Sequence, residues 1–105
     1  MSEAGQLAHI VFFDLNEDTE ANRATLIASA KEHLSGHDGT VYFSVGTLVP
    51  DLDRPVNDNE FAVALHVVFE YRATHDVYKT HERHLAFIET NKASWKRVRV
   101  FDSYL

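Results

Sequence analysis

Two segments of this chain are apolar on both faces of the strands they would form, and no other feature constrains the fold as much. Residues 7–15 are a near-continuous apolar run, rich in β-branched and aromatic side chains. Residues 61–71 are apolar on both parities, with Phe61, Val63, Leu65, Val67 and Phe69 on one side and Ala62, Ala64 and Val68 on the other. Side chains of a strand alternate between its two faces, so both strands have to be covered from two sides.

The other segments supply two helices and two further strands. A polar run at residues 16–20 offers capping oxygens and early acidic side chains for a helix that continues to about Leu34. Gly36 and Gly39 fit a left-handed helix end and a turn. The expected order is strand 7–15, helix to 34, strand 41–49, strand 61–71, helix 74–91 and strand 98–102. This β-α-β-β-α-β order predicts an α+β, ferredoxin-like fold with a four-stranded antiparallel sheet.

Two helices cover only one face of such a sheet, yet the first and third strands are apolar on both faces. The sheet of an identical chain is the economical cover for the second face. It would give an eight-stranded dimeric α/β barrel with a two-fold axis. We therefore expect a homodimer that forms through the open face of the sheet. His66 shares that face with small residues, so we expect it at the dimer interface.

Composition narrows the class of protein further. A chain of 105 residues with 45% hydrophobic content suits one domain, residues 1–105. The absence of cysteine excludes disulfides, zinc-thiolate sites and thiol nucleophiles. A net charge of −6 argues against a nucleic-acid partner. No apolar run approaches the roughly 20 residues that span a membrane, and the N-terminus lacks the basic start of a signal peptide, so a cytoplasmic protein is expected.

One stretch of the second helix gathers side chains that can carry chemistry. A helix advances about 100° per residue, which places Tyr78, His81 and His84 on one side of residues 74–91. Val77, Leu85 and Ile88 fall on the same arc, which we therefore expect to be buried, whereas Phe87 falls almost opposite. Polar groups on a buried arc need partners, so they form either a satisfied core network or the lining of a pocket.

These residues and the order of elements resemble the stress-responsive dimeric α/β-barrel family, the Dabb domain. The resemblance runs from Leu7 to Asp102. It is carried by His9-Ile-Val-Phe-Phe on the first strand, by Val45-Gly46 on the second and by Val67-Val-Phe-Glu70 on the third. The pattern Tyr78-x-x-His81-x-x-His84-x-x-Phe87 and the ending Val100-Phe-Asp102 complete it. The family commonly has proline where this chain has Glu82, and Glu82 allows the helix to run straight through.

The resemblance implies two kinds of function. Some relatives are stress-associated proteins without an established reaction, whereas olivetolic acid cyclase of plants closes a polyketide ring by aldol condensation. Its catalytic tyrosine and histidine correspond to Tyr78 and His84, and its first-strand histidine corresponds to His9. Its pocket histidine on the third strand corresponds to Val63, which is apolar here, so the same cyclisation is not expected.

Each candidate residue has a catalytic and a structural interpretation. His84 can remove a proton next to a carbonyl while Tyr78 steadies the enolate oxygen, or the two can bond each other in the core. We expect His81 to be a core histidine bonded to a strand carbonyl or to Asp102, although it can also face a ligand. His9 lines the pocket or bonds structurally, and Val63 lines the same pocket. We expect solvent-facing side chains at His33, His37 and His75.

No metal or other cofactor is expected, because His9, His81 and His84 have no carboxylate at a recognisable ligand spacing. The first functional hypothesis is a non-catalytic, stress-associated module with a closed, packed interior. The second is a cofactor-independent cyclase or aldolase-type enzyme that acts on a small hydrophobic carbonyl compound. The third, a cofactor-free monooxygenase or a ligand carrier, would use the same pocket.

Overall fold

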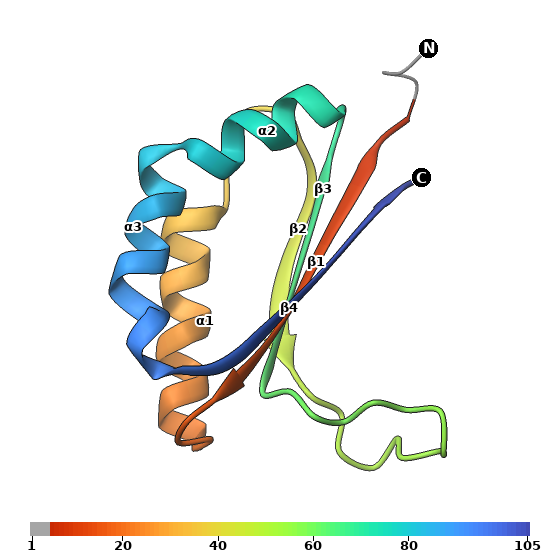
Figure 1. Ribbon diagram of the computed structural model, residues 1–105, viewed down its shortest axis with the longest axis vertical. Helices are drawn as coiled ribbons and strands as arrows, with labels where there is room; N and C mark the ends of the chain where they lie inside the picture. The colour runs from red at the N-terminus through yellow and green to blue at the C-terminus, as the bar shows by residue number, and fades with distance from the viewer. Residues whose placement is uncertain (1–4) are drawn as a thin grey trace.

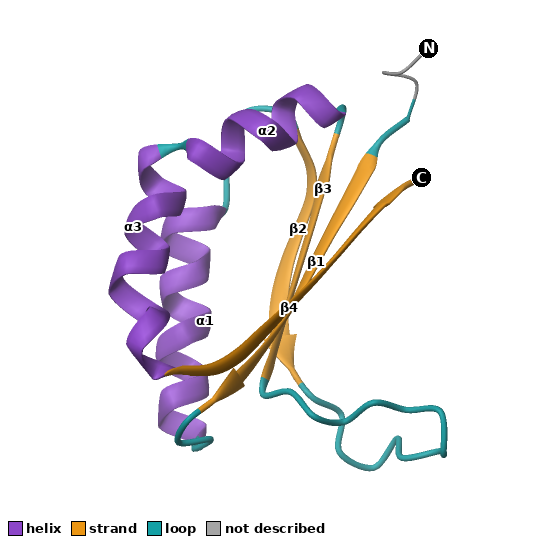
Figure 2. Ribbon diagram, in the orientation of Figure 1, coloured by secondary structure: helices purple, strands orange, loops and turns teal. Residues whose placement is uncertain are grey.

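Strands and helices follow each other in the ferredoxin-like order, in a computed structural model that describes residues 5–105 (Figure 2). Residues 1–4, which the one-domain and signal-peptide predictions included, lie outside this range. The elements are β1 Leu7–Leu15, α1 Glu20–Leu34, β2 Thr40–Thr47, β3 Val63–Phe69, α2 Arg72–Thr80, α3 Glu82–Asn91, a 3-10 turn Lys92–Ser94 and β4 Trp95–Tyr104. The predicted bounds of β1 are confirmed. β4 is longer than predicted, and β3 is shorter.

The two strands that are apolar on both faces lie in the middle of the sheet. Its order is β2-β3-β1-β4, and all neighbouring strands are antiparallel. Val11 of β1 pairs with Leu65 of β3 on one side and with Val100 of β4 on the other. The three α-helices cover one face of this sheet (Figure 1). None of the helices in residues 5–105 is long and apolar enough to cross a membrane.

The hydrophobic core lies between this face and the helices. Val63, Val67 and Phe69 of β3 are fully buried there, and Leu26 and Ala30 of α1 pack against the same cluster. His9 shares its parity with the buried Leu7, Val11 and Phe13, so it faces the helices, as predicted. The alternation along β1 therefore places one polar side chain of the strand under α2 and α3.

The opposite face of the sheet is uncovered in the single chain. Phe12 of β1 contacts Phe61 and Phe101 on this face, with ring centroids 4.9 Å and 5.8 Å away. Phe101 remains 54% exposed, and His66 lies on this face beside Ile10. The loop of residues 48–62 projects to the same side of the sheet, away from the helices (Figure 1).

The predicted helix 74–91 is wrong as a single helix. It is broken at His81, whose backbone is extended with φ −66° and ψ 144°. The imidazole Nδ1 of His81 accepts a hydrogen bond from the backbone N–H of Arg83 at 3.0 Å, so His81 caps α3. Glu82 then occupies the first turn of α3, where a carboxylate is favourable. A histidine cap thus breaks the helix without a proline.

The break also overturns the predicted buried arc. Val77 and Leu85 are 64% and 52% exposed, and His81 is exposed as well. Phe87, expected on the opposite side, is only 2% exposed and packs in the core. One extended residue gives α3 a new direction and phase, so the spacing of a continuous helix does not carry across it.

Gly39 offers a test of the passage from α1 to β2. Its φ is +84°, and an added Cβ would lie 2.5 Å from the Cβ of Thr74 in α2. Gly36 also has a positive φ, of +74°, but an added Cβ would meet nothing. We expect Gly36→Ala to cost about 1–2 kcal/mol of unfolding free energy, and Gly39→Ala clearly more because backbone strain and a clash add. Urea denaturation of both variants measures the difference, and equal losses would contradict the contact with Thr74.

Candidate functional site

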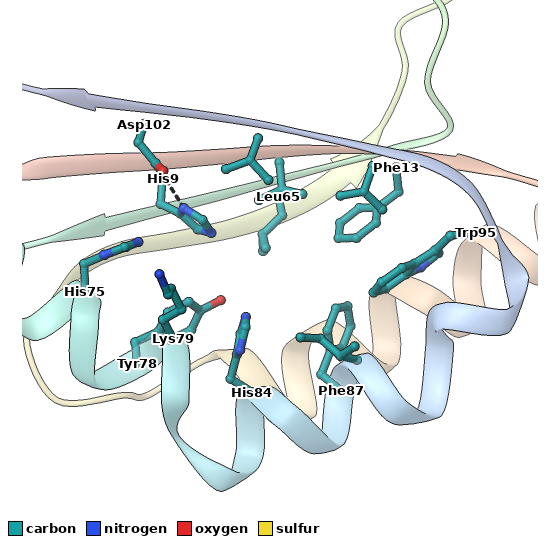
Figure 3. Close-up of a pocket in the computed structure, with 14 residues that line it drawn as sticks. His9, Phe13, Leu65, His75, Tyr78, Lys79, His84, Phe87, Trp95 and Asp102 are labelled. Atoms are coloured by element: carbon teal, nitrogen blue, oxygen red, sulfur yellow. Dashed lines mark hydrogen bonds and ion pairs between the residues drawn. The ribbon is translucent and has the colours of Figure 1, made fainter.

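A cavity of about 310 Å³ lies between the sheet and helices α2 and α3 (Figure 3). Most of its wall is apolar and comes from both layers, namely Val11, Phe13, Leu65, Phe87, Ile88, Trp95, Val98 and Val100. Polar side chains gather toward one end, namely His9, His75, Tyr78, Lys79, His84 and Asp102. The space between the sheet and these two helices therefore contains a cavity with an apolar wall and a polar end.

Tyr78 and His84 lie next to each other in this cavity, Tyr78 on α2 and His84 on α3. Their ring centroids are 4.7 Å apart, and Tyr78 is only 2% exposed. The Tyr78 hydroxyl and the His84 Nδ1 atom are both buried, and neither has a hydrogen-bond partner within residues 5–105. Leaving a buried polar atom unpaired costs about 1–3 kcal/mol, so two neighbouring cases in one cavity indicate a place for a polar ligand atom.

Burial sets the protonation of this pair. It raises the pKa of the Tyr78 phenol far above its ordinary value, so the phenol stays protonated and can donate a hydrogen bond. Burial also lowers the pKa of His84 below 6.5, and the backbone of Lys79 only partly opposes this effect, so the imidazole is neutral at pH 7. A neutral imidazole beside a protonated phenol is the combination that general base catalysis needs.

His9 borders this pair from the sheet. Its ring centroid lies 5.9 Å from that of Tyr78, and its Nδ1–H donates a hydrogen bond of 2.6 Å to Oδ1 of Asp102. The two residues are direct partners in the pairing of β1 with β4. Burial lowers the pKa of His9, and Asp102 partly opposes this effect. Asp102, one of the two alternative partners predicted for His81, thus bonds His9.

Two histidines that were predicted to face solvent are buried. His75 and His37 are 8% and 7% exposed, so both predictions are wrong. His75 lines the cavity, with its ring 5.2 Å from that of His9. His37 packs 4.9 Å from the ring of Tyr78, outside the cavity, and its Nε2–H bonds the backbone carbonyl of His33. His75 precedes Tyr78 by three residues, a helical spacing that places both side chains on the same side of α2. This spacing is the sequence signal that could have predicted His75 in the cavity.

Two predicted ligand-binding residues do not line the cavity. Val63 is fully buried in the core, and the exposed His81 caps α3 instead of lying in the core. Of the predicted site, the structure brings together His9, Tyr78 and His84. His33, predicted to face solvent, is partly buried and bonds within α1.

The buried imidazoles predict a dependence of stability on pH. The pKa values of His9, His37 and His84 are lowered in the folded state, chiefly by burial. Below pH 6.5 the unfolded chain therefore binds more protons than the folded one, and the unfolding free energy falls as pH drops through this range. We expect the Tm to fall between neutral pH and about pH 5, and His84→Asn to flatten this slope. The control is His33→Asn, outside the cavity, and a Tm independent of pH would contradict the prediction.

A four-stranded ferredoxin-like sheet with helices on one face and a cavity between the layers defines the class of this protein. The chain belongs to the Dabb family, the stress responsive A/B barrel domain, whose pattern matches residues 7–105. The resemblance seen in the sequence is thereby confirmed. No curated protein matches the chain.

Solved structures share the fold. A Dabb family protein from Mesorhizobium loti is 21% identical to this chain and superimposes on it with a TM-score of 0.77. The match covers 94% of this chain and 95% of the other chain. A dimeric ferredoxin-like protein of unknown function from Thermobifida fusca is 14% identical with a TM-score of 0.78, covering 96% and 92%. A hydroxynitrile lyase from Passiflora edulis is 18% identical with a TM-score of 0.75, covering 96% and 94%. At these identities the likeness establishes the fold alone.

Proposed function

We propose that this protein is an enzyme that abstracts a proton next to the carbonyl of a small hydrophobic compound. The observation that carries the proposal is the pair of buried polar atoms, Tyr78 hydroxyl and His84 Nδ1, that have no partner within residues 5–105 and belong to side chains lining one apolar cavity. A packed structural core would have paired them.

The chemistry follows from the protonation states. The neutral imidazole of His84 takes the α-proton and becomes an imidazolium, while the C–H electron pair forms the carbon-carbon double bond of the enolate. The Tyr78 hydroxyl donates a hydrogen bond to the enolate oxygen. The apolar wall of Phe13, Phe87 and Trp95 holds the hydrocarbon part of the substrate. Proton transfer by these two residues needs no cofactor.

Deuterium exchange tests the proposal without knowledge of the natural substrate. Benzylacetone has a ketone and an aromatic tail, and its α-protons exchange with D₂O slowly on their own. With EDTA present, we expect the protein to accelerate this exchange more than an equal concentration of free imidazole does. The rate should saturate as the concentration of benzylacetone rises. Nuclear magnetic resonance follows the loss of the α-proton signal. Saturable binding without exchange would assign the cavity to a ligand carrier, and neither binding nor exchange would remove the proposal.

The uncovered face of the sheet supports a second part of the proposal, that two copies form a homodimer through it. Phe12 and Phe101 form an aromatic cluster on this face. Ile10 of β1 and His66 of β3 are paired at its centre, on the two strands that are apolar on both faces. A single chain leaves this surface in contact with water. The protein from Thermobifida fusca that shares this fold is described as dimeric.

A further inference from the structure

A second constellation lies at the polar end of the cavity, beside the proposed base. His9, His75 and Asp102 each offer one ligand atom, and these atoms all lie within 4.8 Å of one another. They are the only such group of three found in residues 5–105. They come from β1, α2 and β4, so the fold and not local sequence brings them together (Figure 3).

We infer that His9, His75 and Asp102 form a binding site for a divalent transition-metal ion such as Zn²⁺ or Co²⁺. Two imidazoles and one carboxylate are a ligand set that suits these ions. Bond lengths of about 2.0–2.2 Å in a tetrahedral site place ligand atoms about 3.4 Å apart. Ligand atoms that now lie up to 4.8 Å apart therefore have to move inward, and the ion has to displace the hydrogen bond between His9 and Asp102. This inference does not depend on the proposed function of His84.

The surroundings of His75 orient it for this role. Its Nδ1–H donates to Oδ1 of Asp76 at 2.9 Å, because a carboxylate can only accept. The Nε2 lone pair is then free, and Figure 3 shows the ring reaching from α2 toward His9 and Asp102. A histidine that binds a metal through one ring nitrogen usually donates a hydrogen bond from the other nitrogen to a carboxylate or carbonyl, and this bond fixes the orientation of the ring. Asp76 is itself fixed by Arg72, whose Nε lies 3.2 Å away.

Burial and charge also fit the ion. The side chains of His9 and His75 are 12% and 10% exposed, whereas Asp102 is 44% exposed and leaves a path from solvent. Asp102 brings a negative charge to the ion, and the cavity offers room for a further ligand. The ammonium of Lys79 lines the same cavity and repels the ion. Removing that charge should therefore tighten binding.

Titration of the untagged protein with Co²⁺ tests the site, because the visible bands of Co²⁺ report its coordination. We expect one ion per chain with bands typical of tetrahedral coordination. Asp102→Asn and His75→Ala should weaken binding by at least about 100-fold, and Asp76→Asn by about 10-fold. Lys79→Met should strengthen it several-fold. Zn²⁺ should displace Co²⁺, and isothermal calorimetry then gives its affinity.

His33→Ala is the matched control, since it removes an imidazole from α1 outside the cavity. Circular dichroism checks the fold of each variant. Asp102→Asn is nearly isosteric, so it keeps the test valid if a histidine variant fails to fold. Absence of the Co²⁺ bands in the wild type, or unchanged affinity in Asp102→Asn and His75→Ala, would overturn the inference. The α-proton exchange assay contains EDTA and so does not depend on a bound metal ion. The metal site and the role of His84 as a base are therefore tested independently of each other.

Discussion

Replacing His84 with alanine is expected to lower kcat/KM for α-proton exchange by about 10²-fold to 10⁴-fold, the contribution of a well-placed general base. The imidazole lines the cavity 4.7 Å from the Tyr78 ring, and no other group in the cavity combines a lowered pKa with an unpaired buried nitrogen within residues 5–105. Affinity for benzylacetone should change little, because the apolar wall is intact. Exchange monitored by nuclear magnetic resonance gives both quantities.

The pH profile of the same assay separates a base from a structural histidine. Because burial lowers the pKa of His84 below 6.5, the rate of the wild type should hold down to that pH and fall only below it. Tyr78→Phe should reduce the rate by about 10²-fold, as the loss of one donor to a developing oxyanion does. His33→Ala is the control and should leave the rate unchanged. Equal rates for the wild type and His84→Ala would exclude His84 as the base.

The sequence predicts the sheet better than the site because strand burial is a local pattern. Residues 7–15 are apolar on both parities, and such a segment fits only the middle of the sheet, where β1 lies. The parity of His9 then places it under the helices without knowledge of any other element. These inferences need only the period of two along one strand.

The second helix shows what such patterns leave out. A single extended residue, His81, decides which side of α3 faces the core, and its cap hydrogen bond to Arg83 is one of several local conformations open to the sequence. A helix that continues straight through His81 predicts a buried Leu85 and an exposed Phe87, which is the reverse of what the structure shows. The motif still brought Tyr78 and His84 together, because both face the cavity across the break.

Contacts between segments that are distant in the chain could not be predicted from sequence patterns either. The partner of Asp102 depends on the register of β4 against β1, which pairs it with His9 and not with His81. A shift of one residue would have turned Asp102 to the other face of the sheet. Likewise, His37 follows the turn at Gly36, and only the packing of that turn on α2 buries it against Tyr78. Register and turn packing are tertiary properties.

Substituting Ile10 with aspartate is expected to disrupt the proposed homodimer. Ile10 lies on the central strand of the uncovered face, directly paired with His66 on one side and with Phe101 on the other. A carboxylate there would be buried against the partner sheet without a counter-charge, at a cost of about 3–5 kcal/mol. Each interface would carry two copies of the charge by symmetry, so the dissociation constant should rise at least about 10²-fold. Sedimentation velocity over a range of concentrations measures it.

Leu85→Asp is the matched control for the introduced charge, since Leu85 is a 52% exposed apolar residue on α3, in the helical layer on the other face of the sheet. It should leave the dimer intact, whereas Ile10→Val should keep both the fold and the dimer. The cavity lies on the helical side of the sheet, so an Ile10→Asp monomer that stays folded should retain the Tyr78 and His84 pair. A wild-type chain that sediments as a folded monomer at micromolar concentration would exclude the dimer. An Ile10→Asp dimer of unchanged affinity would place the interface on another surface, because an unpaired carboxylate cannot be buried at the centre of this one without cost.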